Sequence, residues 1–107
     1  MKNFFFVKLN SKVIKLKFEE VVFIEGLKNY AKIHTLSGSF LTLTSMKQLE
    51  NFLPPEEFIR IHKSYIIAVN HINQMTKSEV CIEDRKCLPV GETFRGKLRA
   101  FVDGNMI

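Results

Sequence analysis

Apolar and polar residues alternate with a period of two along most of the chain, the pattern of β-strands that bury one face and expose the other. In an early segment, Ile14, Leu16 and Phe18 alternate with two lysines. A continuous apolar run at residues 21–24 instead indicates a strand covered on both faces. The segments with strand character are residues 14–18, 21–24, 30–36, 40–43, 59–62, 65–69, 72–75, 80–82 and 86–90. The chain is therefore predicted to be mainly β.

The hydrophobic period lengthens to that of a helix in two places. Ser45 and Gln48 have the spacing of a capping box, and apolar residues then follow at helical intervals, which predicts a helix over residues 45–53. Pro54 ends this helix. Apolar residues at i, i+4, i+7 and i+8 predict a second short helix near residues 92–102.

The connections and the composition indicate one compact domain over residues 1–107. Ser-Gly-Ser at residues 37–39 predicts a hairpin turn, and Asp84 with Arg85 predicts a turn between the last two strands. Hydrophobic residues make up 46% of the chain and include ten phenylalanines, enough to form a core. No repeat, linker or low-complexity tract divides the chain.

The apolar runs are too short to place the chain in or across a membrane. The longest uninterrupted run covers residues 65–69, against the roughly 20 residues that a membrane span needs. Residues 4–7 are too short for the apolar region of a signal peptide. We therefore expect a soluble protein of the cytoplasm.

Cysteine, histidine and serine offer few routes to metal or catalytic chemistry. Cys81 and Cys87 are too few for a disulfide framework and lie in apolar, strand-like stretches, which predicts reduced and buried thiols. Their spacing and that of the three histidines do not match a zinc site. His62 and Ser64 superficially offer two members of a catalytic triad, but no nucleophile elbow or glycine-rich phosphate loop accompanies them. Neither an enzyme nor a cofactor or metal is expected.

The distribution of charge is more informative than the net charge of +5. No acidic residue occurs in residues 1–18, 26–49 or 58–78, and several lysines and an arginine fall in the last two windows. If loops from these windows share a face, that face carries an uncompensated positive potential suited to an anionic partner.

Two polar segments could bring hydrogen-bond donors to such a face. In residues 59–65, Arg60, His62, Lys63 and Ser64 stand among apolar residues that could anchor them. Such donors suit phosphate oxygens and the guanine edge, although a solvated strand edge would have the same composition. Residues 28–30 form a similar polar tip, and an ordinary loop explains it equally well.

The order of these segments resembles the LytTR DNA-binding domain of bacterial response regulators. Three blocks carry the resemblance: residues 22–33, with an acid, a polar tip and an aromatic; residues 58–67, with phenylalanine, arginine, histidine, lysine, serine and tyrosine in series; and residues 88–95, a proline-containing strand leading into the last helix. The resemblance spans about residues 4–102, and the block at residues 58–67 is the most specific.

The resemblance implies an elongated antiparallel β fold with two short helices, whose loops enter successive major grooves of double-stranded DNA. By position, the contact loops would comprise Lys28, Asn29 and Tyr30; His62, Lys63 and Ser64; and Gly91, Glu92 and Thr93 with Arg95. It also implies that the chain is the output part of a response regulator with a receiver domain and an upstream sensor kinase, bound to paired direct repeats, with a possible dimer on DNA.

The chemistry of these residues assigns roles within that frame. Lys63 could donate to guanine or to a phosphate, and Asn29 could pair with adenine. Better phosphate anchors than base readers are Lys28, Lys47, Ser64, Arg95 and Lys97. Arg60 and His62 could contact DNA or could support the loop instead.

Two departures and two alternatives accompany the resemblance. Ala68 stands where many members have asparagine, and Glu92 where many have a basic residue. Glu92 could accept from cytosine N4 but would repel phosphate. The alternative functions are a protein-interaction or ligand-sensing β domain, and a single-stranded nucleic-acid binder, for which the chain lacks an evident platform of aromatics.

Overall fold

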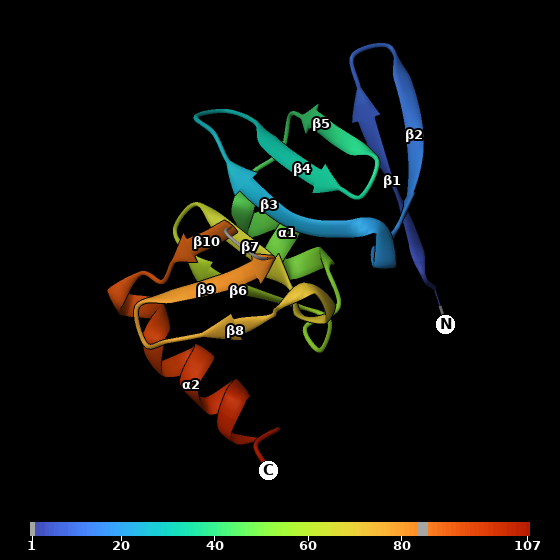
Figure 1. Ribbon diagram of the computed structural model, residues 1–107. Helices are drawn as coiled ribbons and strands as arrows, with labels where there is room; N and C mark the ends of the chain where they lie inside the picture. Colours follow the sequence, from blue (N-terminus) through green and yellow to red (C-terminus); the bar gives the residue numbers. More distant parts are fainter. Residues whose placement is uncertain (1, 84–85) are drawn as a thin grey trace.

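The computed structural model describes residues 2–83 and 86–107. A five-stranded antiparallel sheet with the strand order β5-β4-β3-β7-β6 forms its centre (Figure 1). The strands are β1 (Phe4–Leu9), β2 (Lys12–Lys17), β3 (Val21–Gly26), β4 (Ala31–Thr35), β5 (Gly38–Thr42), β6 (Phe58–His62), β7 (Tyr65–Ala68), β8 (Gln74–Met75), β9 (Glu79–Glu83) and β10 (Lys86–Pro89). The helices are α1 (Met46–Phe52) and α2 (Arg95–Asp103), and the 3-10 turns are η1 (Phe18–Glu20), η2 (Val69–His71) and η3 (Glu92–Phe94).

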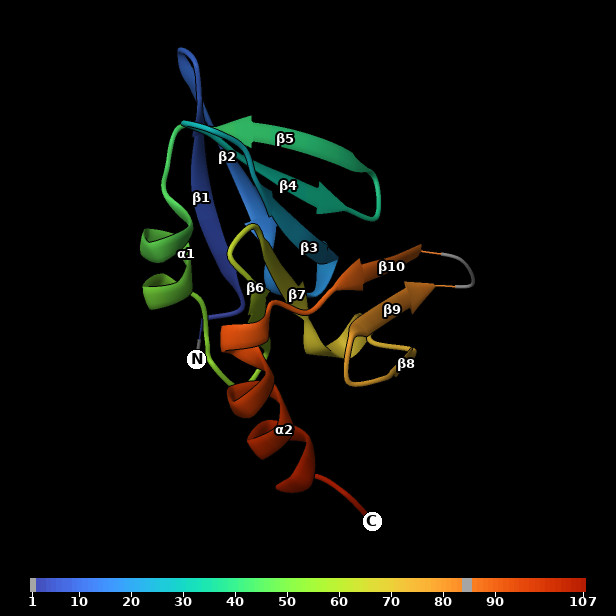
Figure 2. The same ribbon diagram turned by 90° about the vertical axis from the view of Figure 1, so that its left-hand side faces the viewer.

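Two smaller antiparallel sheets pack around the central one. Strands β1 and β2 form a hairpin, and β8, β9 and β10 form a three-stranded sheet with β9 in the middle. Figures 1 and 2 show the hairpin at one end of the molecule and the three-stranded sheet with α2 at the other. The molecule measures 44 × 31 × 27 Å along its principal axes, so the predicted elongated and mainly β architecture is confirmed.

The central sheet separates two hydrophobic clusters because successive residues of a strand point to opposite faces. Within β3, Ile24 belongs to the cluster shared with β1, β2 and α1, whereas Phe23 belongs to the cluster shared with β9, β10 and α2. Both residues are buried, as the continuous apolar run at residues 21–24 predicts. The sheet therefore supports both halves of the molecule.

The start of α1 follows the predicted capping box. The Ser45 hydroxyl accepts a hydrogen bond from the Gln48 backbone N–H at 3.1 Å, and Gln48 Oε1 accepts one from the Ser45 backbone N–H at 3.2 Å. These bonds satisfy two backbone donors at and beside the helix start, which would otherwise lack partners. The helix ends at Phe52, with Leu53 as the C-cap before the two prolines.

Several element boundaries differ from the sequence prediction. Phe18 is buried as predicted but lies in η1 instead of a strand, because the chain turns there and the Glu20 side chain accepts from the Lys17 backbone N–H at 2.8 Å. The strand predicted at residues 72–75 is reduced to β8, since η2 takes up the preceding chain. The second helix begins at Arg95, after η3. The turn predicted at residues 84–85 lies outside the described residues.

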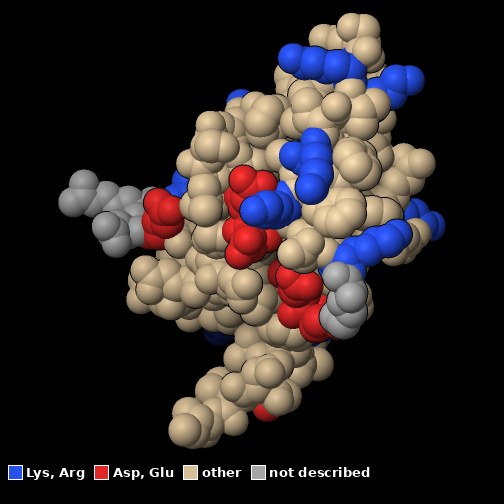
Figure 3. Space-filling view, turned by 90° about the vertical axis from the view of Figure 1, so that its right-hand side faces the viewer, with Lys and Arg blue, Asp and Glu red and all other residues tan. Residues whose placement is uncertain are grey.

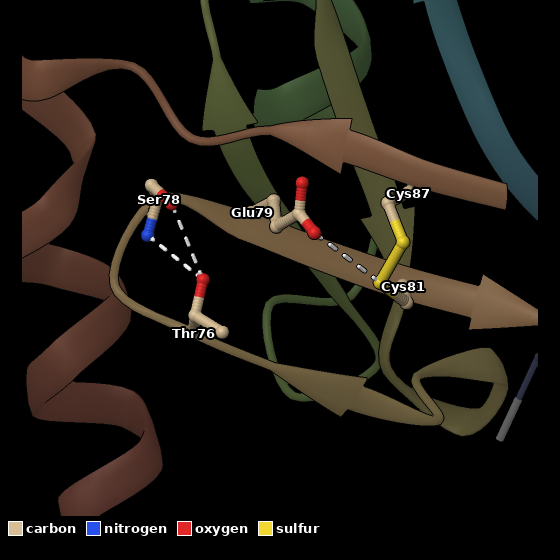
Figure 4. Close-up of a disulfide and its surroundings, with 5 residues drawn as sticks. All are labelled: Thr76, Ser78, Glu79, Cys81 and Cys87. Atoms are coloured by element: carbon tan, nitrogen blue, oxygen red, sulfur yellow. Dashed lines mark hydrogen bonds between the residues drawn. A yellow bond between two sulfur atoms is a disulfide. The ribbon is translucent and has the colours of Figure 1, made fainter. Parts of the chain in front are cut away.

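The prediction of two reduced cysteines is wrong. Cys81 and Cys87 form a disulfide that joins β9 to β10, with Glu79 Oε2 4.0 Å from Cys81 Sγ (Figure 4). The two cysteines lie opposite each other in the ladder, because β9 and β10 pair antiparallel. Cys81 is buried, but Cys87 is exposed. Within the described residues, Glu79 and these cysteines form a group that could hold a metal by distance alone, yet the disulfide occupies both sulfurs.

In residues 2–83 and 86–107, we find no helix with the length and apolar character needed to cross a bilayer.

Candidate nucleic-acid interface

Three connections between strands and helices meet along one edge of the molecule. They are the β3–β4 turn at residues 27–30, the β6–β7 turn at residues 63–64, and the segment from residue 90 into η3. Gly26 N–H donates to Ser64 O and Gly91 N–H donates to Ile61 O, each at 2.8 Å. The β6–β7 turn is thus bonded to the end of β3, and the strand before it, β6, is bonded to Gly91. Figure 2, which faces this edge, shows the connections one below another with α1 beside them.

Backbone hydrogen bonds within the β3–β4 turn fix its shape, and its side chains are exposed. Leu27 N–H donates to Tyr30 O at 2.8 Å, and Tyr30 N–H donates to Leu27 O at 3.3 Å. Lys28 and Asn29 lie between these bonds and are exposed, and Tyr30 is 49% exposed. All three residues predicted for the first contact loop therefore stand on the surface of this edge.

The β6–β7 turn presents Lys63 and fixes its own shape through His62. Lys63 is exposed, whereas His62 and Ser64 are half-buried. Ser64 N–H donates to His62 Nδ1 at 3.0 Å, so the neutral imidazole carries its proton on Nε2. The His62 ring also packs against Tyr65, with ring centroids 5.4 Å apart. His62 therefore supports the turn, and its Nε2–H adds a further donor.

Arg60 lies beneath this turn. Its guanidinium donates to the carbonyl oxygens of His62 and Lys63 and to the Glu50 carboxylate. Only 17% of its side chain is exposed. Between the two roles left open by the sequence, the contacts favour support over DNA contact for Arg60.

The third connection lies close against the second. A Cβ at Gly91 would stand 3.2 Å from Phe94 Cδ2 and 3.5 Å from His62 Cα, so glycine permits this approach. Glu92 and Thr93 are exposed in η3, and Arg95 is exposed at the first position of α2. The structure thus places the predicted third loop beside the β6–β7 turn.

Cationic side chains flank the three connections. Met46 at the start of α1 packs against Gly26, which places Lys47 in the first helical turn near the β3–β4 turn. Lys97 Nζ lies 3.4 Å from Glu50 Oε2. The exposed cations of the predicted interface are Lys28, Lys47, Lys63, Arg95 and Lys97.

The acidic side chains are distributed differently. At the predicted interface, Glu50 is engaged by Arg60 and Lys97, and Glu92 is exposed. The side of the molecule facing away from this edge carries Asp and Glu side chains gathered at its middle, with Lys and Arg side chains mostly above them (Figure 3). The exposed cations of the predicted interface outnumber Glu50 and Glu92, so this edge can attract an anion.

Sequence reasoning missed two residues that build this edge. Glu50 lies ten positions before Arg60 on a different element, so no local pattern connects them. Phe94 was predicted only as an apolar position of the last helix, yet its ring lies 5.5 Å beneath the Arg60 guanidinium carbon. A glutamate near the end of one helix and an arginine in the next strand form no recognisable sequence pattern. Their contact could therefore not be predicted from the sequence.

Comparisons with known proteins identify one family. Residues 11–103 match the family model of the LytTr DNA-binding domain. The CO-responsive transcriptional regulator RcoM of Rhodospirillum rubrum is 34% identical over 59 residues, which are 55% of this chain and 25% of that protein. The transcriptional regulatory protein LytR of Staphylococcus aureus is 33% identical over 69 residues, 64% of this chain and 28% of that protein.

A solved structure agrees with the same fold. The LytTr DNA-binding domain of a response regulator from Bacillus cereus superposes with a TM-score of 0.80 at 23% identity, covering 95% of this chain and 98% of that one. The chain spans about a quarter of the length of each of these two curated relatives.

Proposed function

This chain belongs to the LytTR family of DNA-binding domains, and on that premise we propose that it binds specific sequences of double-stranded DNA as the effector domain of a bacterial transcriptional regulator. One observation carries the proposal. Three polar connections lie side by side, are joined by backbone hydrogen bonds, and are flanked by exposed lysine and arginine side chains. Such an edge matches a duplex, which offers base edges in its grooves between rows of phosphates.

We assign base reading to the tips of the connections. The major groove is about 12 Å wide and admits a narrow protein element. Lys63 stands at the centre of the edge and would donate to guanine O6 and N7, and Asn29 would pair with adenine. Glu92 would accept from cytosine N4, a contact that its repulsion from phosphate confines to the groove.

The remaining residues of the edge would set the position of the duplex. Phosphate contacts fix the register of a protein on DNA without reading sequence. The proposed anchors are Lys28, Lys47, Ser64, Arg95 and Lys97, with Tyr30, His62, Gly91 and Thr93 lining the contact. DNA binding of this kind requires no catalytic group, and we propose no enzyme activity.

The wider context is proposed from the family resemblance. We propose that the full regulator carries a receiver domain, responds to a sensor kinase and acts in the cytoplasm. Two such chains would occupy paired direct repeats as a dimer on the DNA. The dimer would bind more tightly than either chain alone, because binding of one chain raises the effective concentration of the other at its site.

The test begins with selection of bound sequences from a random pool of duplexes, followed by titration of the selected duplex at several salt concentrations. With four cationic phosphate contacts among the proposed anchors, log affinity should fall linearly with log salt with a slope of about −3 to −4. Lys15→Ala is the control for substitutions of interface lysines such as Lys63→Ala. Lys15 is exposed on β2, which lies at the far side of the molecule from the three connections in Figure 1. Failure to retain any duplex in dilute buffer would reject the proposal and favour a protein-interaction domain.

A further inference from the structure

One side chain joins the parts of the candidate interface. The Arg60 Nη2 donates to Lys63 O at 2.7 Å and its Nε donates to His62 O at 3.3 Å, both in the β6–β7 turn. Its Nη1 donates to Glu50 Oε1 of α1 at 3.1 Å. The guanidinium also lies over the Phe94 ring of η3. The Arg60 side chain of β6 therefore contacts the β6–β7 turn, α1 and η3.

The chemistry of these contacts requires arginine. A guanidinium is a rigid planar fork whose N–H groups can reach several acceptors at once and whose face can stack on an aromatic ring. A lysine ammonium is a single point of charge on a flexible stem and cannot hold two carbonyls and a carboxylate in one fixed geometry. The hydrogen bonds of Arg60 are used within the protein, and its side chain is mostly buried, so it offers little to a phosphate.

We propose that Arg60 is a specificity-determining positioning residue, which holds the β6–β7 turn at a fixed spacing from α1 and η3 without contacting DNA. The proposal rests on the DNA-binding function proposed above. Reading bases needs side chains held within about 0.5 Å of the productive geometry. Attraction to phosphates is long-ranged and tolerates displacement. Loss of Arg60 should therefore weaken binding to the selected sequence far more than binding to an unrelated one.

Glu50 orients this arginine. Its two carboxylate oxygens accept from Arg60 of β6 and Lys97 of α2, so α1 is tied to both elements. Neutralising Glu50 leaves an oxygen acceptor for Arg60 but removes the charge that makes the bond strong. Glu50→Gln should therefore reproduce the effect of an Arg60 substitution in weaker form.

Arg60→Lys and the matched control Arg99→Lys test the proposal on DNA. Arg99 is exposed on α2 and pairs with Asp103, so its substitution changes the same chemistry away from the edge. For Arg60→Lys we expect about a tenfold loss of affinity for the selected duplex, less than about a twofold loss for a scrambled duplex, and an unchanged salt slope. An equal loss on both duplexes would make Arg60 a sequence-independent phosphate contact and overturn the proposal.

Amide hydrogen exchange in the free protein supplies a test that needs no DNA. The Gly26 N–H donates to the turn that Arg60 holds, the Ser64 N–H donates within it, and the Gly91 N–H donates to Ile61 of β6 just before it. In Arg60→Lys they should exchange about tenfold faster, while the core amide of Ile24 and all four amides in Arg99→Lys stay as in the wild type. If wild-type protein binds no duplex, the proposed function fails, yet these rates still decide whether Arg60 positions the turn.

Glu50→Gln covers the case in which Arg60→Lys does not fold. A loss of discrimination between the two duplexes, with faster exchange at the same three amides, supports the proposal. Unchanged discrimination and unchanged exchange in Glu50→Gln, or in a folded Arg60→Lys, overturns it.

Discussion

Lys63 stands at the tip of a turn whose backbone is held from below and from both sides. Its carbonyl accepts from Arg60, and the neighbouring Ser64 carbonyl accepts from Gly26. The Lys63 side chain is exposed in the described structure. An exposed ammonium group on a fixed backbone can reach either a base or a phosphate. The two contacts differ in their effect on sequence preference.

Lys63→Ala separates them. If Lys63 reads a base, the substitution should weaken binding to the selected site by about 1 to 3 kcal/mol and relax the preference at one position. If it touches phosphate alone, all sequences should lose affinity alike and the salt slope should fall by about one. Titration of the selected duplex and of single-base variants distinguishes these results. Equal affinity of Lys63→Ala and wild type would remove the residue from the interface.

Glu92 offers the opposite charge on the same edge. It is exposed at the start of η3, beside Gly91 and before Arg95. Glu92→Gln removes a repulsion from phosphate, so binding to scrambled duplex should tighten by roughly two- to threefold. A cytosine contact through N4 would add a loss of preference at one position of the selected site. Tighter binding at every site without a change in preference would assign Glu92 a purely electrostatic effect.

Element α1 links the edge to the first hydrophobic cluster. Leu49 is buried in that cluster, Met46 packs against Gly26, and Glu50 receives Arg60. A helix of seven residues has little stability of its own, because it forms few intrahelical hydrogen bonds to offset the entropy lost in ordering its backbone. The placement of Lys47 and Glu50 therefore depends on the cap and on packing.

Ser45→Ala tests the cap. The substitution removes the oxygen that accepts the Gln48 N–H, and it should lower the free energy of unfolding by about 1 kcal/mol. Urea denaturation followed by circular dichroism measures the loss. Ser37→Ala serves as the control, because Ser37 is an exposed serine in the β4–β5 connection, away from any helix. Equal midpoints for Ser45→Ala and wild type would mean that packing alone fixes α1.

The elements divide into those that local patterns predict and those that they do not. The alternation around Ile33 and the Ser45–Gln48 spacing involve neighbours in sequence, so the strands and the capped helix follow from the sequence. The η1 turn at Phe18 depends on where a strand ends, and the Cys81–Cys87 disulfide depends on which residues face each other across β9 and β10. Alternation encodes neither. Local periodicity therefore predicts elements better than the points at which they end.

The candidate site divides in the same way. The polar tips could be found because their residue types and order are local and resemble a known family. The group that fixes them could not, since Glu50, Arg60 and Phe94 come from three elements and meet only in the folded chain. Burial of Arg60 under the turn is likewise a tertiary property, and it decides between a contact role and a support role.

For the whole molecule, the arrangement of two clusters on one sheet implies cooperative unfolding. Strands β3, β6 and β7 of the central sheet contribute residues to both clusters, so neither cluster persists once these strands separate. The three connections of the edge come from strands of this sheet and from β10. The proposed interface therefore depends on the global fold for its geometry, in addition to the local contacts that hold its turns.

Ile33→Val and Ile61→Val test this cooperativity with one chemical change in each cluster. Ile33 of β4 and Ile61 of β6 are both 0% exposed and lie in different clusters, so each substitution should cost about 1 kcal/mol. Urea unfolding should give lower midpoints with unchanged slopes. In a Tyr30→Phe background, where Tyr65 is the remaining tyrosine, circular dichroism and the fluorescence of Tyr65, which packs against the second cluster, should report the same transition. If Ile33→Val moved the circular dichroism transition and left the tyrosine transition in place, the two halves would unfold separately, and the edge could lose its β3–β4 turn while keeping the other two connections.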